Sequence, residues 1–155
     1  MKAECTNQQT FQLSENNQTL GSLHYKTIFS SDAEVVLPNN ERYEIKPNGF
    51  FGTSVIITKN STAIAELRMN MKGQIVISFT NGEEYIFKNT SFLNNKFVIE
   101  NKNTEKLIQY DPNLNWSKLN YNYNISHNLK TQEPLFILIG VYAANYYIAA
   151  MSGLV

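Results

Sequence analysis

A repeat with a period of about 43 residues constrains the fold of this chain more than any other feature of its sequence. The segment 39–62, NNERYEIKPNGFFGTSVIITKNST, aligns without a gap with the segment 81–104, NGEEYIFKNTSFLNNKFVIENKNT. Self-similarity at a fixed period indicates one supersecondary unit that is used several times. The identical pairs are Asn39 with Asn81, Glu41 with Glu83, Tyr43 with Tyr85, Lys46 with Lys88, Phe50 with Phe92, Ile57 with Ile99, and Thr62 with Thr104.

A further copy of half of this unit lies near the start of the chain. The segment 11–25, FQLSENNQTLGSLHY, aligns with the segment 55–69, VIITKNSTAIAELRM, and keeps its apolar positions although few residues are identical. Phe11 and Leu13, for example, match Val55 and Ile57. The same period found twice in succession predicts three units in one chain.

Each unit has the pattern of four short β-strands. Alternating polar and apolar residues, β-branched residues and Asn-Gly turns are signals of strands and hairpins. The first unit predicts the strands TFQLS, TLGSLHY, AEVVL and RYEIK, and the second predicts SVIIT, AIAELRM, GQIVISF and EEYIF. The third predicts KFVIE and KLIQY and then degenerates into SKLNYNYNIS. Roughly eleven strands are therefore expected between about residues 9 and 126.

Four strands in about 43 residues is also the period of a β-propeller blade. Three blades are too few, because propellers normally take about four to eight blades around a central channel. We therefore expect a mainly β fold in which about twelve strands curl into one closed barrel, which leaves no unpaired edges. A barrel of this size leaves an interior that its own wall side chains do not fill.

The end of the chain supplies a segment that suits this interior. From Leu135 to Val155 there is no charged side chain, and Pro134 suits a first helical turn, so a helix over about 134–152 is predicted. The 21 residues from Leu135 to Val155 would form a helix about 31 Å long, which would also permit a tail anchor across a bilayer. Tyr142, Asn145 and Tyr147 lie in the middle of the run, where a membrane span disfavours polar groups. We expect the helix inside the barrel and keep the tail-anchored membrane protein as the alternative.

The layout of strand units such as FQLSENNQTLGSL and SVIITKNSTAIAEL, the late WSKLNYNYNIS, and the apolar PLFILIGVYAANYYIAAM resembles the tubby C-terminal-like superfamily. This superfamily joins the tubby domain, the phospholipid scramblases and the LURP-one-related proteins. The resemblance implies a twelve-stranded barrel around a central hydrophobic helix, as one domain over residues 1–155. It also implies a binding role, since tubby domains bind phosphoinositides through basic residues on the outer wall. No residues of that lipid site match here.

Composition narrows the classes of partner. The 155 residues include thirteen Lys and Arg and thirteen Asp and Glu, so no overall field gathers nucleic acid, and no nucleic-acid partner is expected. Only Arg42 and Arg68 are arginines, which disfavours a surface that binds several phosphate groups through arginine side chains. The sole cysteine, Cys5, excludes an internal disulfide, and four residues before it are too few for a secretion signal, so a cytoplasmic location is the expectation.

Few residues of the chain are candidates for a catalytic or metal-binding role. His24 and His127 have no partner at metal-ligand spacing, and we expect them to be ordinary strand residues rather than metal or acid–base groups. Cys5 is expected in a frayed N-terminus, where pairing with a histidine is disfavoured. Glu83 and Glu84 are adjacent, and adjacent residues of a strand point to opposite faces, so they are not expected to share a substrate.

The repeated Lys46, Lys88, Tyr43 and Tyr85 are interpreted as structural residues of their hairpins. Trp116 is expected to cover a barrel end, with a ligand seat as the alternative. The sequence thus predicts no catalytic residues, no metal and no cofactor, and assigns no ligand-binding residues. The hypothesis it supports is a non-enzymatic, cytoplasmic binding domain, either free or peripheral to the membrane, whose partner is an anionic lipid surface or another protein.

Overall fold

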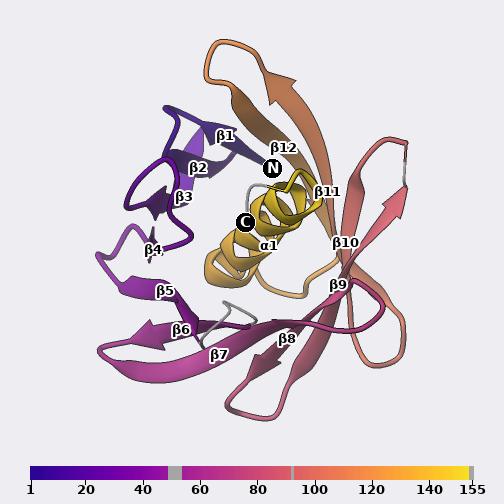
Figure 1. The fold of residues 1–155 in the computed structure, drawn as a ribbon. Coiled ribbons are helices and arrows are strands. Elements are labelled where there is room, and N and C mark those ends of the chain that lie inside the picture. Colours follow the sequence, from indigo (N-terminus) through magenta and orange to yellow (C-terminus); the bar gives the residue numbers. More distant parts are fainter. Residues whose placement is uncertain (49–53, 92, 154–155) are drawn as a thin grey trace.

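Twelve strands form one closed antiparallel barrel around a single C-terminal helix (Figure 1). The computed structural model describes residues 1–48, 54–91 and 93–153. The strands are β1 Lys2–Cys5, β2 Thr10–Glu15, β3 Gln18–Tyr25, β4 Ala33–Val36, β5 Arg42–Asn48, β6 Ser54–Lys59, β7 Thr62–Met69, β8 Ile75–Phe79, β9 Glu84–Ser91, β10 Lys96–Glu100, β11 Lys106–Asn115 and β12 Asn120–His127, and the helix is α1 Pro134–Met151. The predicted fold class and the predicted helix are confirmed.

The eleven strands predicted from the sequence correspond to β2 through β12. The twelfth strand, β1, lies in a segment where we expected a frayed terminus, and that prediction was wrong. β1 pairs with β2 through Ala3 and Leu13, and with β12 through Ala3 and Tyr123. Ala3 and Cys5 are buried, so β1 both supplies core side chains and closes the ring.

The three sequence units follow one another around the barrel. β2 to β5 form the first unit and β6 to β9 the second, whereas β10 to β12 are completed by β1, which occupies the place of the missing fourth strand. In each unit the register between the first two strands shifts at the equivalent place, after Leu13, Ile57 and Ile99. Such a bulge bends a strand, and a regular set of bulges helps a sheet to close. The identical pair Phe50 and Phe92 lies outside the described residues.

Asparagine supplies turn conformations that the repeat needs. The β2–β3 turn has positive φ at Asn16 and Asn17, and the β6–β7 turn has it at Asn60 and Ser61. Two successive residues with positive φ are the mark of a type I′ turn, whose twist matches that of the strands it joins. Asparagine tolerates this conformation better than most side chains. The asparagine-rich composition therefore follows in part from the many tight hairpins.

The N-terminal half of α1 is buried along its whole circumference. All side chains from Phe136 to Ala144 are buried, and the helix lies inside the ring of strands (Figure 1). The helix approaches the wall closely at Gly140, because a Cβ atom built there would lie 1.9 Å from the hydroxyl oxygen of Tyr110. An apolar helix without a polar face suits such a site.

The wall of the barrel provides hydrogen-bond partners for polar groups of the helix. The Tyr110 hydroxyl donates to the Ile137 carbonyl (3.0 Å), and the Tyr142 hydroxyl donates to the Ser31 carbonyl (2.9 Å). By length and composition α1 could cross a membrane, but half of its residues are buried within the barrel. Tyrosine and asparagine in the middle of the apolar run are thus accommodated by the protein interior.

Candidate functional site

The two ends of the barrel have different chemistry. Neighbouring strands are antiparallel, so successive connections alternate between the two ends. We call the end where α1 finishes the apolar end and the end where α1 begins the polar end. The described connections of the apolar end are 6–9, 26–32, 70–74, 93–95 and 116–119, and those of the polar end are 16–17, 37–41, 60–61, 80–83, 101–105 and 128–133.

Every large hydrophobic side chain that is exposed in the described part of the chain lies at the apolar end. Phe29 is 93% exposed and Trp116 is 78% exposed, each at or near the tip of a connection. The full set is Ile28, Phe29, Met71, Leu93, Leu114, Trp116, Leu119 and Met151. Single exposed hydrophobic residues are normal on protein surfaces, but their collection on one face marks an interaction site.

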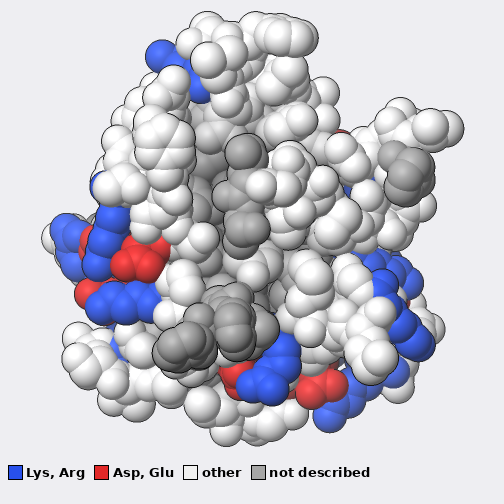
Figure 2. Space-filling model, viewed as in Figure 1, with Lys and Arg blue, Asp and Glu red and all other residues white. Residues whose placement is uncertain are grey.

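Charged side chains are sparse at this end. Its described connections hold Lys26, Lys72 and Lys118 and one carboxylate, Asp32. None of these three lysines forms a salt bridge with a carboxylate in the described ranges. Figure 2 shows this face, where the described residues near the centre are white and the blue and red residues lie toward the periphery. The polar end carries most of its charge as glutamate: Glu41, Glu83, Glu105 and Glu133, with Lys102 and Lys130.

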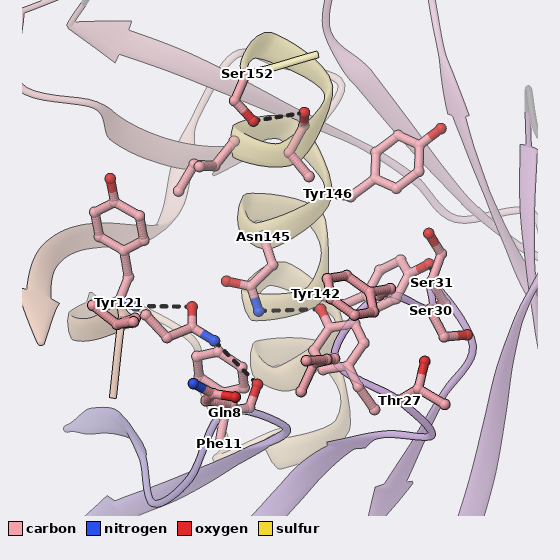
Figure 3. A pocket seen from close by; sticks show the side chains of 17 residues that line it. Gln8, Phe11, Thr27, Ser30, Ser31, Tyr121, Tyr142, Asn145, Tyr146 and Ser152 are labelled. Atoms are coloured by element: carbon pink, nitrogen blue, oxygen red, sulfur yellow. Dashed lines mark hydrogen bonds between the residues drawn. The ribbon is translucent and has the colours of Figure 1, made fainter. Parts of the chain in front are cut away.

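A pocket of about 480 Å³ opens at the apolar end, beside the second half of α1. Figure 3 shows the helix behind the pocket, Tyr121 and Gln8 on one side, and Tyr142 and Thr27 on the other. The walls come from separate parts of the chain: the connections 26–32 and 116–119, the start of β12, and α1 itself. Residues in positions so distant in sequence meet only because the barrel closes around the helix.

Asn145 of α1 lies between the tyrosines of the pocket (Figure 3). Its Oδ1 atom accepts a hydrogen bond from the Tyr123 hydroxyl (2.6 Å), and its Nδ2 atom donates to the Tyr25 hydroxyl (3.1 Å). The rings of Tyr25 and Tyr142 stack, with centroids 5.9 Å apart. Burial raises the pKa of the Tyr25, Tyr123 and Tyr142 hydroxyls, so these phenols stay protonated at neutral pH.

The structure does not bring the two histidines together. His24 lies near the apolar end of β3, where Thr10 contacts its Nδ1 atom at 2.7 Å, and His127 ends β12 at the polar end. Cys5 is on the interior face of the wall, whereas His24 is on the exterior face, so they form no nucleophilic pair. The Cys5 thiol donates to Asn122 Oδ1 (3.2 Å), and burial raises its pKa. A buried thiol with a raised pKa is a poor nucleophile.

The repeated lysines and tyrosines of β5 and β9 make separate local contacts. Lys46 pairs with Glu44 at 3.0 Å, and Lys88 pairs with Glu100 at 2.8 Å. Tyr43 donates its hydroxyl to Glu41 (2.8 Å). Its repeat partner Tyr85 instead packs on Phe136 of α1, with ring centroids 4.7 Å apart, and on Phe79.

The adjacent carboxylates of the polar end also act separately. Glu83 accepts a hydrogen bond from Asn81 within its own turn, and Glu84 accepts one from Ser78 on the neighbouring strand. Both line an open hollow with Lys102. Among the described residues there is no cluster of three or more His, Cys, Asp or Glu side chains that could hold a metal ion.

Trp116 lies at a barrel end but does not cover it, because its side chain projects into solvent. The sequence drew attention to Asn145 and Tyr142 only as residues that disfavour a membrane span. Their position among otherwise apolar helix residues was the available signal for a pocket. This signal was not enough to predict the pocket, since the sequence does not show which wall residues face Asn145 and Tyr142.

Comparison with protein-family models, with curated proteins and with solved structures finds no match to this chain.

Proposed function

We propose that this chain is a peripheral membrane-binding domain that docks on an anionic lipid surface through the apolar end of the barrel. The observation that carries the proposal is the placement of all exposed large hydrophobic side chains of the described residues at that one end. The partner is an anionic bilayer, and the protein is bound at its surface rather than spanning it.

The shape of the apolar end favours a bilayer over a protein partner. Its hydrophobic side chains stand on separate connections, with Phe29, Met71, Leu93 and Trp116 on four different ones. Separate tips of this kind can enter the headgroup region individually, while the polar backbone between them stays hydrated. Tryptophan in particular suits the boundary between headgroups and acyl chains.

The charges of the apolar end suit an anionic surface. Lys72 adjoins the exposed Met71, and Lys118 adjoins Leu119. With Lys26 they exceed the single carboxylate, Asp32, by two charges, although the whole chain has a formal net charge of zero. Basic residues near an anionic membrane contribute about 1 kcal/mol each, so these lysines add to the apolar contribution.

The resemblance to tubby-like barrels supports this proposal at the level of layout. A twelve-stranded barrel with a central apolar helix is the arrangement that the resemblance implies, and membership of that superfamily is part of the proposal. Fold alone does not establish function, so the argument depends on the surface. The burial of Phe136–Ala144 inside the barrel favours peripheral binding over the tail-anchored alternative.

Vesicle binding tests the proposal with a built-in reporter, because Trp116 is the only tryptophan of the chain. The full-length protein is mixed with vesicles of phosphatidylcholine alone or with added phosphatidylserine. We expect a blue shift of Trp116 emission and co-sedimentation with the anionic vesicles, and we expect both to weaken as salt is raised. Absence of binding to anionic vesicles at low salt would contradict the proposal and favour a protein partner.

Three double variants locate the docking face. The double variant Lys72→Ala, Lys118→Ala should weaken vesicle binding, whereas Lys102→Ala, Lys130→Ala at the polar end should not. The double variant Met71→Ser, Leu93→Ser should reduce binding even at low salt, since both side chains are exposed and their removal leaves the core intact. Protein that leaves natural membranes only with detergent, and not with salt or alkaline carbonate, would favour the tail anchor instead.

A further inference from the structure

The pocket beside Asn145 has the size of a small-molecule site. Its volume of about 480 Å³ lies within the ~300–1,000 Å³ that is usual for ligand pockets. Of the docking residues named above, Met71, Leu93 and Trp116 do not line it, whereas Phe29 does. Ligand binding in this pocket can therefore be tested separately from vesicle binding, with variants at Met71 and Leu93 that leave the lining unchanged.

The lining of the pocket carries no charge. Its described residues are aromatic and aliphatic side chains with neutral polar groups, and among them there is no Lys, Arg, Asp, Glu or His. An ionised ligand group would lose its hydration without gaining an opposite charge, which is costly. The lining thus favours an uncharged ligand that is mostly apolar.

The Tyr25 hydroxyl in the pocket is available as a hydrogen-bond donor. The Tyr25 hydroxyl accepts from Asn145 Nδ2, but its own proton goes to no acceptor in the described part of the chain. The neighbouring Tyr142 hydroxyl is already engaged with the Ser31 carbonyl. Tyr25 can therefore donate to a carbonyl, ester or hydroxyl oxygen of a ligand.

The mouth of the pocket shares residues with the apolar end. Ile28, Phe29 and Leu119 line the pocket and are also exposed hydrophobic side chains of that end. A protein docked by this end would hold the mouth against the bilayer. Molecules of the bilayer would then reach the pocket without crossing water.

We infer that the pocket binds one uncharged single-chain lipid, with an oxygen of its head accepting a hydrogen bond from Tyr25 and its chain against the apolar walls. This inference deepens the proposed function and rests on it for the source of the ligand. The geometry that carries it is the neutral lining, the free donor at Tyr25, and the opening among the docking side chains.

Native mass spectrometry of the full-length protein tests the inference with two probes of equal chain length. The probes are 1-monooleoylglycerol, which is uncharged, and oleate, which is anionic at neutral pH. We expect a one-to-one complex with 1-monooleoylglycerol and at least tenfold less complex with oleate. No complex with either probe, or equal retention of both, would overturn the inference.

Variants place the lipid in this pocket. Ala149→Phe fills the pocket and should abolish the complex, whereas Met151→Phe, exposed on the same helix and outside the lining, should leave it intact. Tyr25→Phe removes the hydroxyl that donates to the ligand, and with it the acceptor of Asn145 Nδ2, and should weaken the complex about three- to tenfold, as expected for one neutral hydrogen bond to the ligand. A complex that survives Ala149→Phe unchanged would contradict the assignment.

The same variants separate this inference from the proposed function. Ala149→Phe should lose the lipid complex but keep vesicle binding, and Met71→Ser, Leu93→Ser should do the reverse. A wild-type protein that forms the complex but ignores vesicles would refute membrane docking and leave the pocket assignment standing. A protein that binds vesicles but forms no complex would refute the pocket assignment alone.

Discussion

Gly140 leaves no room for a side chain between the helix and the wall. An added Cβ atom would lie 1.9 Å from the Tyr110 oxygen and 2.3 Å from its ring, and Tyr110 is fully buried and bonded to Ile137. We expect Gly140→Ala to lower the free energy of unfolding by about 2 kcal/mol or more, because overpacking forces the ring or the helix to move. Urea denaturation followed by circular dichroism measures this loss.

A second substitution identifies the clash as the cause. In a Tyr110→Leu background, which removes the hydroxyl and the ring, the further loss from Gly140→Ala should be much smaller than in the wild type. Such a cycle isolates the interaction between the two positions. Equal losses in both backgrounds would show that the alanine acts in some other way.

Buried phenols make the stability of the protein depend on alkaline pH. Tyr110, Tyr123 and Tyr142 are buried, and burial raises the pKa of each hydroxyl. In the unfolded chain these groups lose their protons near pH 10, while the folded state keeps them. The unfolded state then binds fewer protons, so the stability present below about pH 10 falls as the pH rises further, by about 1.4 kcal/mol per pH unit for each group.

Urea unfolding at a series of pH values above neutrality checks this expectation. The part of the tyrosinate absorbance that comes from these three phenols should appear together with the loss of circular dichroism, since they ionise only on unfolding. The variant Tyr110→Phe should show a shallower slope than the wild type, because it carries one buried phenol fewer. A slope unchanged by this substitution would refute the role given to Tyr110.

At the scale of elements, β1 decides whether the barrel is closed. Its four residues pair with β2 on one side and β12 on the other. Deletion of residues 1–5 should lower stability and promote self-association, because it exposes two strand edges with unpaired backbone groups. Size-exclusion chromatography at several concentrations measures the association, and a synthetic peptide of the deleted residues should reverse it.

The control for this deletion keeps the strand and alters only its surface. Lys2 and Glu4 form an exposed ion pair at 3.0 Å, and pairs of this kind contribute about 0–1 kcal/mol. The double variant Lys2→Ala, Glu4→Ala should therefore remain monomeric and nearly as stable as the wild type. If the deleted protein behaved the same way, β1 would not be needed for closure.

For the molecule as a whole, α1 is the core around which the wall is built. A chain that ends at Glu133 should not fold, since the buried side chains of the wall would lose their packing partner. Ile139→Asp should likewise cost more than about 4 kcal/mol, because it buries an unpaired charge. Circular dichroism and proteolysis check both outcomes, and Met151→Asp, at an exposed position of the same helix, serves as the control. A folded, soluble chain ending at Glu133 would instead favour a tail anchor.

The whole molecule is also polar at one end and apolar at the other, and its proposed activity depends on that difference. The inward-facing side chains of the strands pack against the helix. The connections lie outside this core, so their residues can differ in polarity without disturbing it. The apolar side chains Phe29, Met71 and Trp116 come from connections that alternate with polar ones such as 37–41 and 80–83. One scaffold therefore combines a rigid core with a specialised end.

The sequence by itself determined the positions of eleven strands, the repeat and the buried helix. Strand alternation and the apolar helix are local patterns that the chain shows before it folds, as in RYEIK (42–46) and in PLFILIGVYAANYYIAAM (134–151). β1 was not predicted because Lys2–Cys5 is too short to show an alternating pattern. Its pairing also depends on Leu13 and Tyr123, which are distant in the sequence.

Only the tertiary structure decided where the candidate site lies. Tyr25, Tyr121 and Asn145 are separated by many residues, and the closure of the barrel around α1 is what places them in one pocket. The alternation of antiparallel connections likewise assigns Phe29 and Trp116 to the same end. Contacts that form when the barrel closes depend on pairing between strands far apart in the sequence. No local sequence pattern predicts that pairing.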